Sequence, residues 1–97
     1  MSCTLIGLLN IKDAEAFDEY RLAVPETLKN YQGRVLGRGP LQDTFANENQ
    51  LPEFDAVAVI EFPNLELAQQ WAHGPEYQSI LAVRNKGISL TLRAFGT

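Results

Sequence analysis

An uninterrupted apolar run, Ala56–Ile60, constrains the fold of this chain more than any other stretch. The run is too short for a surface helix and apolar at every position, so it predicts a buried strand. Pro63 ends this strand, because proline lacks the N–H that a sheet ladder needs. Asn64 is a favourable N-cap, since its side chain can accept a hydrogen bond from a free amide. The sequence therefore predicts a strand followed at once by a helix, with Trp71 on the core-facing stripe of that helix.

Three further strands and two further helices are predicted around this unit. Apolar side chains at steps of three and four predict a helix that begins at the N-cap Asp13 and runs to Tyr31. Pro75 suits the first position of another helix, which is predicted to run to Arg84. The remaining predicted strands are Thr4–Ile11, Arg34–Arg38 with Leu41–Phe45 as a candidate continuation, and Ile88–Phe95.

Proline and glycine positions refine these elements. Pro25 removes one backbone hydrogen bond, so it should kink the first helix or begin a second short one. Gly33 is expected to end that helix as the left-handed residue of its C-terminal cap. Polar residues over Ala46–Glu53 predict a hairpin loop of about 8 residues between the second and third strands.

The predicted element order is β-α-β-β-α-β, the α+β arrangement of ferredoxin-like folds. Its antiparallel sheet has the order 4-1-3-2, and residues 1–97 are expected to form a single domain. The two central strands are apolar on both faces, but helices can cover only one face of the sheet. An uncovered face of this kind would leave a large exposed apolar patch. We therefore expect a homodimer whose protomers pack sheet to sheet.

Composition narrows the classes of partner and of chemistry. A net charge of −4 disfavours nucleic acid and anionic membranes as partners, and no apolar run approaches the length of a membrane helix. Cys3 and His73 are the only residues of their types, so neither an intrachain disulfide nor a zinc site of His and Cys can form. The start of the chain lacks the pattern of a signal peptide, so a cytoplasmic location is expected. No phosphate-binding loop is present, and we expect no metal and no cofactor.

Three stretches of the sequence together resemble a known family. They are 13–25, which ends in Val24-Pro25; 33–39, Gly-Arg-Val-Leu-Gly-Arg-Gly; and Ile60-Glu61-Phe62-Pro63 with Trp71 and Pro75-Glu76-Tyr77. The chain thus resembles the family called domain of unknown function 1330, small bacterial proteins of the dimeric α/β-barrel superfamily. The resemblance implies a ferredoxin-like protomer, a homodimer and a cleft between sheet and helices, and it implies no established reaction. Pro40 and Gly74 depart from the residues usual in the family, where glycine and serine often stand.

Arg38 and Glu61 are two candidate ligand-binding residues. Arg38 lies at a strand end and could hold a carboxylate or enolate in the cleft, although an edge-strand arginine can also serve only to discourage aggregation. Glu61 is a carboxylate in an apolar strand, on the face of Val57 and Val59. Glu61 could act as a base, but the favoured interpretation is that it forms an ion pair with Arg38 across the hairpin.

Tyr77 and Arg84 are the other two candidates, and they share one helix face because they lie seven residues apart. Tyr77 could donate a hydrogen bond into a pocket or simply pack with its hydroxyl at a wet edge. Arg84 could reach the same pocket or merely favour the C-terminal end of its helix. His73 suits acid–base chemistry by its ordinary pKa, but a surface position at a helix end is the favoured reading. No catalytic residue is assigned.

Two functions follow from these residues. The first is a homodimer that binds a small acidic or carbonyl compound in the cleft. Fold-level analogy with cofactor-independent monooxygenases, isomerases and cyclases leaves open whether the compound is also turned over. The second is a non-catalytic accessory or stress-related dimer without a ligand site. A wet pocket lined by Arg38, Glu61 and Tyr77 would favour the first, and a cleft filled by side chains the second.

Overall fold

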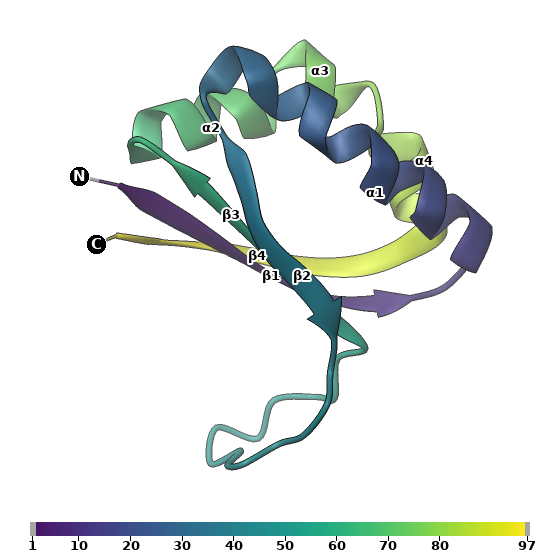
Figure 1. The fold of residues 1–97 in the computed structure, drawn as a ribbon. Helices are drawn as coiled ribbons and strands as arrows, with labels where there is room; N and C mark the ends of the chain where they lie inside the picture. The colour runs from purple at the N-terminus through teal and green to yellow at the C-terminus, as the bar shows by residue number, and fades with distance from the viewer. Residues whose placement is uncertain (1, 97) are drawn as a thin grey trace.

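The computed structural model describes residues 2–96 as one antiparallel sheet with helices on one of its faces (Figure 1). The strands are β1 (Cys3–Ile11), β2 (Arg34–Pro40), β3 (Ala56–Phe62) and β4 (Ile88–Gly96). The helices are α1 (Ala14–Leu28), α2 (Leu65–His73), α3 (Pro75–Gln78) and α4 (Leu81–Gly87), with a 3₁₀ turn, η1 (Lys29–Tyr31), after α1. The sheet order is β2-β3-β1-β4, which is the predicted 4-1-3-2 order counted from the other edge. The predicted α+β ferredoxin-like fold is confirmed.

Side-chain caps begin the two main helices where the sequence predicts them. The carboxylate of Asp13 accepts a hydrogen bond from the Ala16 amide at 3.0 Å, at the start of α1. The Asn64 side chain accepts one from the Leu67 amide at 2.8 Å, at the start of α2. Each cap satisfies one of the amides that a helix start leaves without an intrahelical partner, and so fixes the point where the chain leaves the sheet.

The C-terminal half of α1 agrees with the sequence prediction only in part. Pro25 lies inside a helix that continues to Leu28, and no second helix begins at it. The left-handed residue that ends η1 is Gln32, with φ of 60°, whereas no glycine in residues 2–96 has a positive φ. Gly33 is needed for space instead, since a Cβ there would lie 2.6 Å from Cε1 of Phe62. The glycine thus allows the chain to pass close against the core as it enters β2.

A bulge interrupts the pairing of β2 with β3. Arg34 lies opposite Glu61 and Val35 opposite Ile60, but the next paired residue, Gly37, lies opposite Val59. Leu36 is therefore an extra residue in β2. An extra residue of this kind reverses the side of the sheet to which the following residues point, because side chains alternate between faces along a strand.

The connection between β2 and β3 is longer and less regular than predicted. Strand β2 ends at Pro40, and the candidate continuation Leu41–Phe45 forms no strand. Residues 41–55, here called the arm, form a loop whose base is closed by a hydrogen bond from the Leu41 amide to the Asp55 carbonyl at 2.9 Å. The arm extends away from the helices, past the opposite side of the sheet (Figure 1). Its Phe45 side chain is 96% exposed.

The core lies between the helices and the covered face of the sheet. Trp71, Phe62 and Leu28 are its largest fully buried side chains, which confirms Trp71 as a core residue. The Trp71 ring lies 5.5 Å from that of Phe62 and 4.3 Å from that of Tyr77, measured between centroids. Its indole N–H donates to the Thr27 hydroxyl at 3.0 Å, which ties α2 to α1 and satisfies two buried polar groups.

The opposite face of the sheet, here called the open face, carries no helix of the described chain (Figure 1). Along β1, the buried residues Cys3, Leu5 and Leu9 alternate with half-buried Ile6 and Leu8, which therefore point to the open face. Val57 and Val59 share that face, since they lie directly opposite Leu8 and Ile6. The predicted two-faced apolar character of the central strands is thus present in the structure.

Candidate functional site

A cleft of about 370 Å³ lies between α1 and the covered face of the sheet. Most of its walls are apolar, because α1 turns its core stripe toward a sheet face that is itself apolar. Its side-chain walls include Phe17, Tyr20 and Val24 from α1, Leu90 and Leu92 from β4, and Trp71 from α2. Gly7 contributes no side chain to the floor, and a Cβ there would lie 3.3 Å from Cδ1 of Leu92.

The bulge in β2 decides which arginine reaches this cleft. Arg38 lies opposite Ala58 on the covered face and lines the cleft. Arg34 lies on the open face and binds Glu61, with Nη2 and Nε at 2.7 and 3.0 Å from the same carboxylate oxygen. The predicted Arg38–Glu61 ion pair is therefore wrong. Regular alternation would place both arginines on one face, and the extra residue Leu36 puts them on opposite faces.

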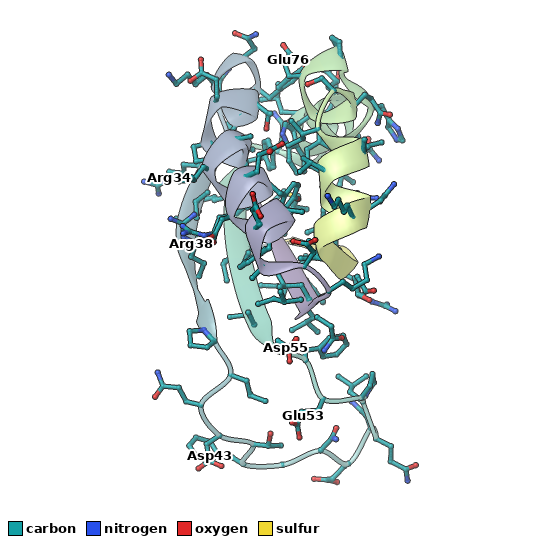
Figure 2. All side chains as sticks on the ribbon, turned by 90° about the vertical axis from the view of Figure 1, so that its right-hand side faces the viewer. Arg34, Arg38, Asp43, Glu53, Asp55 and Glu76 are labelled. Carbon is teal, nitrogen blue, oxygen red and sulfur yellow. The ribbon has the colours of Figure 1, made fainter. Side chains whose placement is uncertain are left out.

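Arg38 stands at the cleft without an anionic partner. Among residues 2–96 its guanidinium makes no hydrogen bond and no ion pair. The other arginine of the cleft, Arg21, is engaged by the Asp18 carboxylate at 2.9 Å. The acid of the cleft, Asp55, lies at the root of the arm and accepts a hydrogen bond from the Ile11 amide at 2.8 Å (Figure 2). Arg38 is thus the cleft cation that is free to take up an anion.

Tyr77 and Arg84 belong to a hydrogen-bonded chain that reaches the cleft through a third residue. The two tyrosine hydroxyls, of Tyr20 and Tyr77, lie 2.8 Å apart, and Nη1 of Arg84 donates to the Tyr77 hydroxyl at 3.2 Å. The Arg84 guanidinium also lies 5.7 Å from the centre of the Tyr77 ring, within range of a cation–π contact. Tyr77 is only 3% exposed and is not part of the cleft wall, whereas Tyr20 is.

Tyr20 is the cleft residue that sequence reasoning missed. It lies on the apolar stripe of α1, so its spacing indicates a core position and nothing more. Its contact with Tyr77 spans 57 residues of sequence, and no local pattern predicts a contact of that range. Burial, and secondarily the neighbouring Tyr77, raises the pKa of Tyr20 above its ordinary value, so its hydroxyl stays protonated at physiological pH.

Glu61 and His73 lie away from the cleft. The Glu61 side chain is 30% exposed and is held by Arg34 on the open face. His73 is exposed at the C-terminal end of α2 and lines no part of the cleft. Of the four predicted ligand-binding residues, the structure therefore brings Arg38 to the cleft wall and Tyr77 and Arg84 to a position behind Tyr20, but not Glu61.

The Pro-Glu-Tyr segment has a structural contact of its own. Glu76 accepts hydrogen bonds from the Tyr31 hydroxyl at 2.5 Å and from the Asn30 amide at 2.8 Å. The bond from Tyr31, followed by that from Asn30, lowers the pKa of Glu76. A Cβ at Gly74 would lie 2.2 Å from the Tyr31 hydroxyl oxygen, so the glycine makes room for this contact. These residues join η1 to α3 at the end of the molecule labelled Glu76 in Figure 2.

Among residues 2–96, no three side chains of His, Cys, Asp or Glu come together in a way that could hold a metal ion. None of the helices described is long and apolar enough to cross a membrane.

Several solved structures share the fold. A protein of unknown function from Rhodopseudomonas palustris is 14% identical, with a TM-score of 0.80 over 99% of this chain and 82% of that chain. A dimeric ferredoxin-like protein of unknown function from Jannaschia sp. CCS1 is 13% identical, with a TM-score of 0.67 over 100% of both chains. SnoaB, a cofactor-independent oxygenase from Streptomyces nogalater, is 10% identical, with a TM-score of 0.64 over 99% of this chain and 92% of SnoaB. At these identities the likeness shows the fold alone.

Comparison of the sequence with known families is more specific than the structural similarities. No curated protein matches the chain significantly. The family described as Domain of unknown function (DUF1330) matches residues 4–95, which includes every helix described and all of the four strands except the first residue of β1 and the last residue of β4. This match confirms the resemblance that the motifs of the sequence suggest. The chain belongs to the DUF1330 family.

Proposed function

We propose that this protein is a homodimer that binds a small organic acid or carbonyl compound in the cleft between α1 and the sheet. The observation that carries the proposal is Arg38, a guanidinium without a partner among residues 2–96, at the wall of an apolar cleft. A guanidinium binds planar oxyanions through two parallel hydrogen bonds. The apolar walls would receive the body of the ligand, and Arg38 its carboxylate or enolate.

The size and lining of the cleft support a small ligand. Its volume of about 370 Å³ falls in the range of roughly 300–1,000 Å³ that is usual for small-molecule sites. Such sites are mostly apolar and contain a few polar groups that orient the ligand. Arg38 on β2 and Tyr20 on α1 are polar groups of this kind on two different elements. The cleft therefore suits an apolar or aromatic body with an acidic end.

The apolar residues of the open face support the proposed homodimer. Ile6, Leu8, Val57 and Val59 present apolar side chains there, and no helix of residues 2–96 covers them. The similar protein from Jannaschia sp. CCS1 is described as dimeric. A second copy on the open face would bury this surface, and the arm, with its exposed Phe45, extends on the same side of the sheet. The two clefts would then face outward, each beneath its own α1.

Whether the ligand is turned over is a separate matter. SnoaB is described as a cofactor-independent oxygenase, but a shared fold hosts many unrelated reactions. An oxygenase without a cofactor needs a substrate that itself supplies the electrons for oxygen, for example through a readily deprotonated carbon next to a carbonyl group. Arg38 could stabilise the enolate of such a compound, since charge develops on an oxygen atom there. The proposal therefore commits to binding, and acidic carbonyl compounds are the first class to test for turnover.

A thermal-shift screen of aromatic acids and keto acids tests the proposal. A ligand at 100 times its Kd should add about 2.7 kcal/mol to the free energy of unfolding. Arg38→Ala should weaken acid binding at least tenfold, because a charge-assisted hydrogen bond contributes about 1.5–3 kcal/mol. Arg38→Lys, which keeps the charge but not the two parallel N–H groups, should lie in between.

Arg34→Ala is the matched control, since it removes the same charge from the same strand but on the open face. Hits that bind equally well to Arg38→Ala would place the site elsewhere. A screen without hits would favour the non-catalytic dimer.

A further inference from the structure

The Tyr20–Tyr77 pair has one more hydrogen-bond donor than it uses. Each hydroxyl carries one proton, and the single bond between the two oxygens, 2.8 Å long, uses one of the two protons. Tyr20 and Tyr77 are 8% and 3% exposed, so the remaining proton belongs to a largely buried side chain. No other oxygen of residues 2–96 accepts it. A buried donor without an acceptor is costly, and native structures seldom leave one.

The third member of the chain indicates which tyrosine keeps the unused proton. Arg84 donates to the Tyr77 hydroxyl at 3.2 Å and so occupies one lone pair of that oxygen. A hydroxyl that accepts a charged donor becomes a better donor itself, because successive hydrogen bonds polarise one another. This polarisation favours Tyr77 as the donor to Tyr20. The unused proton is then that of Tyr20, the one tyrosine of the pair that lines the cleft.

We propose that Tyr20 donates this hydrogen bond to a neutral oxygen of the cleft ligand, and that the ligand is therefore a carbonyl compound with an apolar body. This inference deepens the proposed function by assigning a second recognition point beside Arg38. The two groups come from opposite walls, Tyr20 from α1 and Arg38 from β2. The class that satisfies both is an aromatic or conjugated keto acid, with the carboxylate at Arg38 and the carbonyl oxygen at Tyr20.

The protonation state of Tyr20 suits a donor. Burial, followed by the neighbouring Tyr77, raises the pKa of Tyr20 above its ordinary value of 10. The hydroxyl therefore keeps its proton throughout the neutral range, and its contact with a carbonyl should not vary between about pH 6 and 9. A carboxylate contact would instead follow the ionisation of the ligand.

Two matched pairs of probes test the inference. Acetophenone and ethylbenzene differ in the carbonyl oxygen and have no acid, so they probe Tyr20 without Arg38. The acids 4-oxo-4-phenylbutanoate and 4-phenylbutanoate differ in the same way and probe both groups. In wild-type protein the carbonyl compound of each pair should bind about tenfold more tightly, as measured by NMR titration, because one buried hydrogen bond distinguishes the two. Equal affinities within both pairs would overturn the inference.

Variants assign the effect to one tyrosine. Tyr20→Phe should abolish the preference for the carbonyl compound, whereas Tyr77→Phe, the matched control, should retain it because the Tyr20 proton remains. Loss of the preference in Tyr77→Phe alone would overturn the assignment. Should Tyr20→Phe fail to fold, the hydroxyl proton of Tyr20 in wild-type protein gives the second measurement. Acetophenone should move its NMR resonance downfield and ethylbenzene should not, and equal responses would count against Tyr20.

The probes also separate this inference from the function on which it rests. Acids that bind through Arg38 without any preference for a carbonyl would leave the proposed function standing and overturn the role of Tyr20. If acetophenone binds through Tyr20 but Arg38→Ala does not weaken the binding of the acids, the role of Tyr20 would stand and the proposed binding of acids at Arg38 would be overturned. Absence of binding by all four compounds at millimolar concentration would overturn both.

Discussion

At the scale of single residues, the end of the molecule opposite the arm is held by a polar contact among neighbouring turns. The Tyr31 hydroxyl lies between the Glu76 carboxylate and the backbone of Gly74, where a Cβ would lie 2.2 Å from the hydroxyl oxygen. A serine at this position could not occupy the same backbone without displacing Tyr31. Gly74 and the Tyr31–Glu76 hydrogen bond are thus two aspects of one local arrangement.

This contact should make stability depend on pH. Hydrogen bonds from Tyr31 and Asn30 lower the pKa of Glu76 from its ordinary value of 4.5. The contribution is therefore fully present above about pH 4.5 and is lost as the pH falls through the lowered value in the folded state. Urea unfolding between about pH 6 and 3 should show a smaller loss of stability on acidification in Tyr31→Phe than in wild-type protein. Glu76→Gln should flatten the profile equally, and a Tyr31→Phe profile as steep as that of wild type would contradict the assignment.

At the scale of elements, the starts of the two main helices could be predicted from the sequence, whereas the bulge in β2 could not. The N-caps Asp13 and Asn64 are local signals, and the structure places both helices as these residues predict. The segment Arg-Val-Leu-Gly-Arg reads as regular alternation, and nothing in it marks Leu36 as an extra residue. The bulge is a property of how β2 pairs with β3, so the face of each arginine could not be predicted from β2 alone. Alternation predicts Arg34 and Arg38 on one face, whereas only Arg38 lies at the cleft.

A double-mutant cycle tests the pairing of β2 with β3 that the bulge produces. Arg34→Ala and Glu61→Gln should show a coupling of about 0.2–1 kcal/mol in the free energy of unfolding, the range of a largely exposed ion pair. The side chain of Arg34 is 71% exposed in the single chain, which keeps the expected value small. Arg38→Ala and Glu61→Gln should be additive, since the two residues lie on opposite faces of the sheet. A coupling to Arg38 as large as that to Arg34 would mean that the register is wrong.

At the scale of the whole molecule, the two faces of the sheet serve different purposes in the proposed function. The covered face forms the core and one wall of the cleft, and the open face is proposed to meet a second copy. The prediction of a partner came from alternation alone, because Ile6 and Val59 fall on the face that the helices leave free. The contact of Tyr20 with Tyr77 could not be predicted in this way, since it depends on how α1 packs against α3.

Sedimentation of wild-type protein and of a variant of the open face tests the proposed homodimer. Wild-type protein should sediment at low micromolar concentration as a dimer, twice the 10.8 kDa of one chain, because an obligate interface of this kind buries upward of about 2,000 Å². Val59→Arg places a charge on the apolar open face and should yield the monomer. Leu22→Arg is the matched control, because Leu22 is 68% exposed on α1, and it should remain dimeric. A wild-type protein that sediments only as a single chain would refute the dimer.

The extra residue in β2 bears on how results are transferred among members of the family. Two arginines four positions apart, Arg34 and Arg38, point to opposite sides of the sheet only because Leu36 lies between them without a partner. A relative that lacks this residue would present its second arginine to the open face instead. An alignment that places a one-residue gap on the wrong side of the bulge would then equate a ligand-binding arginine with an ion-pairing one. Strand pairing, rather than sequence identity at the arginines, is the criterion for carrying the cleft from one member to another.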